Sequence, residues 1–354
     1  MKVLYGLCSW GIGHATRSLP IIRKLISEGN ELTVATSGRA LSLLKNELKD
    51  EVQYINFPEF PNPYTETDYF LMKFSAYIPL IMAAIARERL KVSNLTRKNK
   101  YKLIVGDHAY GFNSLRVPSY LLMHQARMIV PKPFTSMEPA TELFNYTNSL
   151  AFKKLCLFDF EENGLAGRLA HDLNIFRKKD IEYMGPTSSF RSKKTKKDID
   201  YLISISGPEP QRSVFQKKLL AQIEQLKGNI VVTLGKPEDA GNKCKSNVKM
   251  YNYMSSEDRE DIMNRAKLII ARSGYSTVCD VAELGAKAFF VPTPQQTEQE
   301  YLGEYLKEKG WYHSNSQKKF DLVKDVKKAQ KYKGYPQKDF TKKSVENFMR
   351  VISN

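Results

Sequence analysis

Residues 266–301 decide the fold and read Ala-Lys-Leu-Ile-Ile-Ala-Arg-Ser-Gly-Tyr-Ser-Thr-Val-Cys-Asp-Val-Ala-Glu-Leu-Gly-Ala-Lys-Ala-Phe-Phe-Val-Pro-Thr-Pro-Gln-Gln-Thr-Glu-Gln-Glu-Tyr. The apolar run 266–271 is typical of a buried parallel strand. Ser273 and Gly274 favour a tight turn and a helix directly after it. A second apolar run, 288–291, follows that helix. The pattern of strand, turn, helix and strand predicts a βαβ unit.

The turn after this strand is a candidate anion site. The N–H groups and the dipole at a helix N-terminus both attract negative charge. Asp280 lies about two turns into the helix, where a carboxylate can reach a ribose hydroxyl. An ordinary βαβ unit with a capped helix is the alternative, and this stretch alone does not decide between the two.

The bulk composition describes a globular chain with a large positive charge. At 354 residues it is long enough for two domains, each with its own core. Hydrophobic residues make up 42% and charged residues 26%, and the net charge is +17. Such a surplus indicates an anionic partner, which can be nucleic acid, an acidic membrane face or a phosphorylated substrate.

The cysteines and the N-terminus indicate the compartment. Cys8, Cys156, Cys244 and Cys279 lie far apart without a Cys-x-x-Cys pair, so we expect neither a disulfide framework nor a zinc site. The chain starts with a strand instead of a signal peptide. No uncharged apolar run reaches the roughly 18 residues of a membrane span. We therefore expect a cytoplasmic protein.

A glycine turn follows the first predicted strand, residues 2–8. Gly11 and Gly13 allow the backbone to approach a ligand closely where the strand turns into a helix. The dinucleotide fingerprint is incomplete because its third glycine is missing. His14 stands in the turn instead. A lone histidine is usually structural, but this position favours a functional one.

A carboxylate follows another strand of the same half. Residues 101–106 are the predicted strand, and Asp107 comes directly after it. Because the carboxyl ends of parallel strands share one edge of a sheet, Asp107 and His14 both face the ligand edge. They can meet there as a base and the residue that orients it.

Residues 69–95 are predicted to form a long amphipathic helix with a basic end. Arg87, Arg89 and Lys91 belong to that end. Such a helix can rest on an anionic membrane. The alternative is a core helix whose basic end is solvated.

The second half of the chain repeats the alternation of strands and helices. We assign residues 1–185 to a first domain, 186–199 to a linker and 200–354 to a second domain, with the last helix as a candidate to pack back on the first. Ser206 and Gly207 form another small-residue turn at a strand end, which can offer N–H groups to phosphates. The predicted fold class is α/β, with two Rossmann-like doubly wound domains facing across a cleft.

These motifs together resemble a known family. The stretch Gly11-Ile-Gly-His14, the pair Ser206-Gly207, and Arg272-Ser-Gly-x-x-Thr277-Val-x-Asp280 continuing to Gln299 are similar to the GT-B glycosyltransferases. Within them the chain resembles the branch of the bacterial UDP-N-acetylglucosamine transferase of peptidoglycan synthesis and the plant galactolipid synthases. The likeness covers both domains in order, but residues 56–100 and 125–185 show no match.

The resemblance implies a role for individual residues. In this family the N-terminal domain takes the acceptor and the C-terminal domain binds the nucleotide sugar. His14 matches the histidine at the catalytic cleft, and Asp107 matches, more loosely, the aspartate that supports it in some plant transferases. The implied donor-binding positions are Gly11, Gly13, Ser206, Gly207, Arg272, Ser273, Gly274, Thr277, Asp280, Gln299 and Glu300.

Two of these positions differ from the peptidoglycan enzyme. Asp280 stands where that enzyme binds ribose with a glutamate, and is one methylene shorter. Gln299 matches a glutamine that reads sugar hydroxyls, but Glu300 stands where the enzyme has a second glutamine. The identity of the transferred sugar is therefore open.

The expected reaction transfers N-acetylglucosamine or a hexose from a UDP-sugar to an acceptor hydroxyl, with inversion and without a metal or a cofactor. The partners we expect are the UDP-sugar and an acceptor glycan or lipid-linked acceptor. An anionic surface of the inner membrane face is a further candidate, which would make the protein peripheral.

Two alternatives stay open. A nucleotide-sugar 2-epimerase shares this fold, but it needs several cleft carboxylates and Asp107 is the only clear one. A nucleic-acid-binding protein would explain the net charge. No RNA- or DNA-reading motif is in view, however, and no specific nucleic acid is expected.

Overall fold

The computed structural model describes residues 1–58, 70–235, 242–245 and 247–353. Side chains are described over the same ranges except 70–76 and 242–245, so those of Leu71, Phe74 and Cys244 lie outside them. The chain divides into two compact units. Unit 1 consists of Met1–Ser189 with Thr341–Asn354, and unit 2 of Phe190–Phe340.

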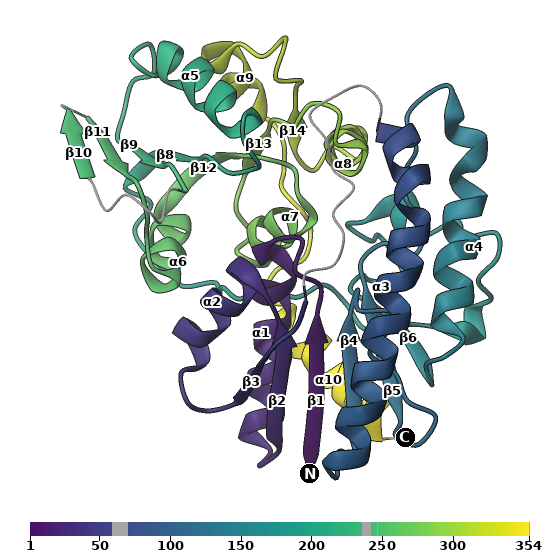
Figure 1. The fold of residues 1–354 in the computed structure, drawn as a ribbon. Coiled ribbons are helices and arrows are strands. Elements are labelled where there is room, and N and C mark those ends of the chain that lie inside the picture. The colour runs from purple at the N-terminus through teal and green to yellow at the C-terminus, as the bar shows by residue number, and fades with distance from the viewer. Residues whose placement is uncertain (59–69, 236–241, 246, 354) are drawn as a thin grey trace. The chain divides into compact units, whose positions relative to one another are not determined.

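Unit 1 contains a parallel sheet whose seven described strands lie in the order β3-β2-β1-β4-β5-β6-β7 (Figure 1). Their bounds are β1 (Lys2–Leu7), β2 (Glu31–Thr36), β3 (Gln53–Asn56), β4 (Leu103–Asp107), β5 (Ser119–Met123), β6 (Lys154–Leu157) and β7 (Ile181–Tyr183). β1 and β4 are neighbours, and their register pairs Leu7 with Asp107. The carboxyl ends of these two central strands therefore lie level at one edge.

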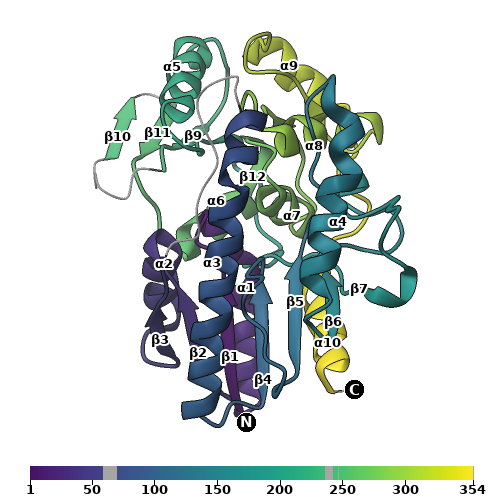
Figure 2. The same ribbon diagram turned by 45° about the vertical axis from the view of Figure 1, so that its right-hand side comes forward.

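Helices cover both faces of this sheet. They are α1 (Ile12–Ser27), α2 (Gly38–Leu48), α3 (Phe70–Lys98), α4 (Glu138–Ser149) and α10 (Thr341–Ser353). α3 lies on one face, and α1 and α10 lie on the other (Figures 1 and 2).

The last helix packs in unit 1. Thr341 Oγ1 accepts a hydrogen bond from Ser188 N at 2.9 Å. Asn347 Nδ2 donates to Met184 O at 3.0 Å, and Phe348 is fully buried. The chain thus returns to its first unit after completing the second.

Unit 2 contains a second sheet, whose seven described strands lie in the order β10-β11-β9-β8-β12-β13-β14. Their bounds are β8 (Ile199–Ser204), β9 (Ile230–Thr233), β10 (Asn242–Lys245), β11 (Val248–Tyr251), β12 (Ala266–Ala271), β13 (Ala288–Phe290) and β14 (His313–Ser314). The pairs are parallel except β10 with β11. This architecture confirms the predicted α/β class with two Rossmann-like units.

Five helices flank the second sheet in the described part of unit 2, namely α5 (Gln211–Ile223), α6 (Ser256–Arg265), α7 (Tyr275–Glu283), α8 (Thr297–Glu308) and α9 (Leu322–Ala329). Phe215 and Leu219 of α5 and Val326 of α9 share one core with the strands. α6 and α7 lie on the opposite face (Figure 1). The helix that the sequence placed after Ser273-Gly274 begins at Tyr275, and is α7.

Some elements differ from the sequence-based expectation. The sequence predicts one helix over residues 143–154 and another after Tyr301, whereas α4 begins at Glu138 and α8 at Thr297. A lysine-rich segment follows residue 317 and contains α9. Leu322, Val326 and Ala329 of this helix are buried, although several lysines lie between them in the sequence. These apolar positions are spaced four and three residues apart, so they form one stripe that anchors the helix despite its charge.

Candidate active site

The glycine turn places His14 at the edge where β1 ends. α1 begins directly after Gly11, and His14 lies in its first turn. Asp107 is the last residue of β4, the neighbouring strand. His14 Nδ1 lies 3.0 Å from Asp107 Oδ1, so the structure brings the two residues together as expected. Their catalytic role stays a prediction.

Asp107 is a fully buried carboxylate in a dense hydrogen-bond network. Arg17 Nε donates to Oδ2 at 2.9 Å, Arg17 Nη2 forms an ion pair with Oδ1, and Ser18 Oγ donates to Oδ2 at 2.8 Å. Burial by itself raises the pKa of the Asp107 carboxyl, but the charge of Arg17 and the contacts with His14 outweigh burial and hold the pKa well below its usual range. Asp107 is therefore ionised at neutral pH.

His14 is held as a neutral imidazole. Burial and the nearby charge of Arg17 lower its pKa, and Asp107 only partly opposes them. Its side chain is 14% exposed, so the ring is not sealed from solvent. A neutral imidazole with an accessible nitrogen can accept a proton, which is what a general base requires.

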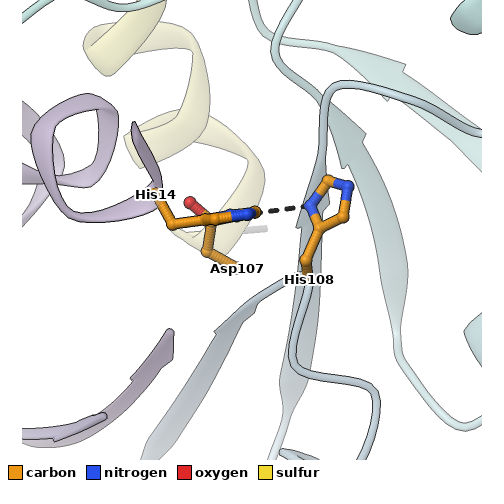
Figure 3. A group of neighbouring side chains, drawn as sticks. All are labelled: His14, Asp107 and His108. Atoms are coloured by element: carbon orange, nitrogen blue, oxygen red, sulfur yellow. Dashed lines mark hydrogen bonds and ion pairs between the residues drawn. The ribbon is translucent and has the colours of Figure 1, made fainter. Parts of the chain in front are cut away.

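Sequence reasoning missed three members of this cluster: Arg17, His108 and His124. Arg17 lies one helical turn after His14 on α1, and this spacing was a signal for a shared face. His108 follows β4 and His124 follows β5, so both stand at strand ends like His14. Figure 3 shows His14, Asp107 and His108 converging.

The donor set of this cluster resembles a metal site, but its charge does not fit one. Ligand atoms of His14, Asp107 and His108 lie within 4.8 Å of one another. Arg17 Nη2 lies 2.6 Å from His14 Nδ1 and 3.1 Å from His108 Nδ1, and pairs with Asp107. Because a guanidinium already supplies the positive charge, a cation bound there would be repelled.

In unit 2 the predicted donor residues gather around the start of α7. Its N-cap is Gly274, which has no side chain to cap the helix. Ser273 Oγ donates to Gln299 O at 2.7 Å, and Gln299 Oε1 accepts from Thr293 N at 2.9 Å. These bonds tie the turn before α7 to the start of α8.

Further along α7, Thr277 is half-buried and Asp280, one turn later, is 9% exposed. Glu300 is exposed, and its Oε1 accepts from Gln295 N at 3.1 Å. Ser206 and Gly207 are exposed at the end of β8, with Gly207 at a φ of 114° that favours glycine. Gly11 and Gly13 lie in unit 1, beside His14.

Arg272 has contacts that the sequence did not indicate. Its guanidinium donates to the backbone oxygens of Val291, Pro292 and Gln211 at 3.0–3.1 Å, and lies 3.9 Å from the ring centroid of Phe215. Burial lowers the pKa of Arg272 to about 10, which leaves it charged at neutral pH. Most of the guanidinium therefore joins β12, β13 and α5.

One nitrogen of Arg272 differs from the others in its hydrogen bonding. Nε is buried and has no hydrogen-bond partner in the described part of the chain. It lies 4.0 Å from the position that a Cβ on Gly207 would take. Contact between Nε and a phosphate at the Gly207 turn stays a prediction.

Two family models match parts of the chain. Residues 211–354 match the family model "Glycosyltransferase family 28 C-terminal domain", and residues 1–60 match "Glycosyl transferase family 1". A 108-residue stretch is 31% identical to the UDP-N-acetylglucosamine--N-acetylmuramyl-(pentapeptide) pyrophosphoryl-undecaprenol N-acetylglucosamine transferase of Burkholderia mallei. This stretch covers 29% of the chain and 27% of that relative, so the chain matches about a quarter of the relative's length.

Solved structures are similar over the whole chain. MurG of Acinetobacter baumannii has a TM-score of 0.61 at 15% identity, with 100% of this chain and 99% of that chain covered. The spinosyn rhamnosyltransferase SpnG has a TM-score of 0.68 at 12% identity, with both chains covered completely. At such identities the likeness shows the fold.

Two Rossmann-like units with these sheet orders define the chain as a protein of the GT-B fold. Residues 211–354 match the family 28 C-terminal domain, and the fold is similar to that of MurG.

Proposed function

We propose that this chain transfers a sugar, N-acetylglucosamine or a hexose, from a UDP-sugar to an acceptor hydroxyl with inversion at the anomeric carbon. The observation that carries the proposal is the hydrogen bond between His14 and Asp107 at the carboxyl edge of the first sheet. The name of the Burkholderia relative, an N-acetylglucosamine transferase that uses a UDP-sugar, supports the donor class.

The proposed reaction is a single displacement. His14 Nε2 takes the proton of the acceptor hydroxyl, and the oxygen attacks the anomeric carbon from the side opposite the diphosphate. The bond between that carbon and the diphosphate oxygen breaks, and UDP departs with the electron pair. One in-line displacement inverts the configuration.

The departing diphosphate needs positive or dipolar groups around it. The start of α7 offers a helix dipole, and Arg272 Nε adds a charged donor near Gly207. We propose that these groups perform the work that a metal ion does in other transferases. Asp280 would bind the ribose hydroxyls, and Gln299 and Glu300 would read the sugar.

We further propose that donor binding is accompanied by hinge motion at the predicted linker, residues 186–199.

For the acceptor we propose a lipid-linked glycan at the cytoplasmic membrane face. The name of the Burkholderia relative specifies a pyrophosphoryl-undecaprenol acceptor for that enzyme. In α3, Ile78, Leu80 and Met82 are exposed apolar residues on the same helix as the exposed Arg87 and Arg89. Among the described helices, none is long and apolar enough to cross a bilayer.

Vesicle flotation tests the membrane part of the proposal. We expect binding to vesicles that contain anionic lipid at low salt, and weaker binding as salt screens the charges. Failure to bind anionic vesicles at low salt would indicate a soluble acceptor.

A parallel thermal-shift screen with UDP, UDP-sugars and oligonucleotides tests the donor. We expect a rise in melting temperature with UDP and one UDP-sugar, because a ligand that binds the folded state stabilises it. A rise with oligonucleotides alone would favour the nucleic-acid-binding alternative.

Incubation of the selected UDP-sugar without acceptor tests the epimerase alternative. The transferase hydrolyses the donor slowly at most, whereas an epimerase interconverts sugars. The structure gives the epimerase no support, because Asp107 is fully buried and paired with Arg17.

A further inference from the structure

The guanidinium of Arg17 lies at the centre of the histidine cluster of unit 1. It is 3% exposed and lies 4.8 Å from the ring centroid of Phe158. Nη1 lies 2.6 Å from His124 Nδ1, and Nη2 lies 2.6 Å from His14 Nδ1 and 3.1 Å from His108 Nδ1. Nε and Nη2 both contact Asp107.

We propose that Arg17 is the positioning residue of the base: it holds Asp107 as the acceptor for His14 Nδ1–H, and keeps the imidazole of His14 neutral so that Nε2 carries the lone pair. This inference rests on the proposed role of His14 as the base. It assigns to Arg17 a function that acts through its neighbours and not by contact with the substrate.

The first argument is the directional chemistry of arginine. A guanidinium has only donors and stays charged in proteins. The Nδ1 atom of His124, 2.6 Å from Nη1, can therefore act only as an acceptor toward it. His108 Nδ1 lies 3.1 Å from Arg17 Nη2 and 3.4 Å from Asp107 Oδ1, and its Nε2 is buried without a partner in the described residues. Burial and the charge of Arg17 also lower the pKa of His108, in agreement with a neutral ring.

The second argument concerns His14 itself. Its Nδ1 lies close to Arg17 Nη2 and to Asp107 Oδ1, and one ring nitrogen cannot accept from the first while it donates to the second. Donation to Asp107 leaves the lone pair on Nε2, the nitrogen that can serve as base. Arg17 keeps Asp107 ionised through two contacts and so strengthens it as an acceptor for Nδ1–H. The proposal requires this effect to outweigh the direct contact of Arg17 Nη2 with Nδ1, which by itself favours the other tautomer.

The third argument is electrostatic. Among the described residues, the charged or titratable side chains closest to His14 are Asp107 on β4, Arg17 on α1, and His108 and His124 after β4 and β5. Asp107 alone would favour a protonated His14, which cannot accept a proton. Arg17 offsets that carboxylate, so the net effect of the cluster is a neutral ring.

Histidine NMR of the wild-type chain tests the proposal without reference to activity. The chain has five histidines, so ring resonances can be assigned with one His→Gln variant each. We expect the titration midpoint of His14 below the ordinary value of about 6.5, and an Nδ1–H tautomer above that midpoint. A midpoint at or above about 6.5, or an Nε2–H tautomer, would overturn the proposal.

Substitution of Arg17 provides the second test. In Arg17→Met, whose side chain is uncharged, Asp107 is expected to pair with a protonated His14, and the His14 midpoint rises by about one pH unit or more. If the transfer reaction has been established, the acid limb of kcat/KM moves to higher pH by the same amount. Arg17→Lys keeps the charge but not the fork, and we expect a smaller shift.

Arg23→Lys is the matched control. Arg23 belongs to the same helix, but its side chain is 46% exposed and pairs with Glu47 on α2, so neither the His14 midpoint nor the pH profile should change. If Arg17→Met does not fold, the wild-type titration and Arg17→Lys still decide the question. If Arg17→Met folds and the titration midpoint of His14 is unchanged, the role of Arg17 is refuted. If the wild-type chain transfers no sugar from any UDP-sugar, only the proposed function is refuted.

Discussion

Replacement of Asp107 by asparagine tests the core of unit 1 and the proposed base at once. The substituted side chain would keep the size of the original but lose its charge. Arg17 would then stay buried without a counter-charge. Removal of one partner of a buried ion pair costs about 3–5 kcal/mol of unfolding free energy. The loss of a correctly oriented base is expected to lower kcat about 10²- to 10⁴-fold.

The pH dependence of the stability effect follows from the pKa of Asp107. The folded-state pKa is depressed, so the carboxylate stabilises the fold above its unfolded pKa of about 3.9 and loses this effect as pH falls through the folded value. The difference between wild type and Asp107→Asn should therefore be constant from about pH 6 to about pH 8, and should narrow only below about pH 4.

Urea unfolding followed by tryptophan fluorescence measures this difference in the full chain. The chain has two tryptophans, Trp10 in unit 1 and Trp311 in unit 2, so a Trp311→Phe background leaves Trp10 as the reporter of unit 1. Glu47→Gln, which breaks the exposed pair with Arg23, is the control and should cost about 1 kcal/mol or less. A loss below about 1 kcal/mol in Asp107→Asn, with turnover reduced less than about tenfold, would refute the reasoning.

Three further predictions concern other parts of the chain. Asp280→Ala should weaken UDP binding about tenfold or more, because charged hydrogen bonds to the ribose are lost. His14→Ala should keep its UDP affinity and lose turnover. If calorimetric titrations show an equal loss of UDP affinity in both variants, the assigned roles are contradicted. Gly6→Ala should lower the unfolding free energy of unit 1 by about 1–3 kcal/mol, because the new Cβ would lie 2.2 Å from the Phe112 ring. An unchanged midpoint of urea unfolding would show that the ring can move. Burial raises the pKa of Glu88 to about 7, so this carboxyl favours the fold when protonated and its ionisation costs stability as pH rises toward 7. Glu88→Gln should therefore raise the unfolding free energy by about 1 kcal/mol or more at about pH 8, and by little at about pH 4. An equal change in unfolding free energy at the two pH values would be inconsistent with a buried, titrating carboxyl.

The sequence by itself determined the local elements and the strand ends at which the candidate residues lie. Strand and helix periods are local, so the turns after β1, β8 and β12 could be located from the order of apolar, glycine and serine residues. Because ligand sites in such sheets lie beyond the carboxyl ends of the strands, His14, Asp107 and Ser273 could be singled out in advance. The apolar stripe of α9 is also present in the sequence, with lysines between its apolar residues.

Only the tertiary structure decided which groups meet. The neighbouring positions of β1 and β4 depend on the packing of the whole sheet, and they bring Asp107 to Arg17, which lies 90 residues earlier in the chain. Three partners of Arg272 are likewise backbone oxygens of distant segments, which no side-chain pattern records. A buried polar group must be satisfied by whatever donors and acceptors surround it, and those surroundings exist only after the chain has folded.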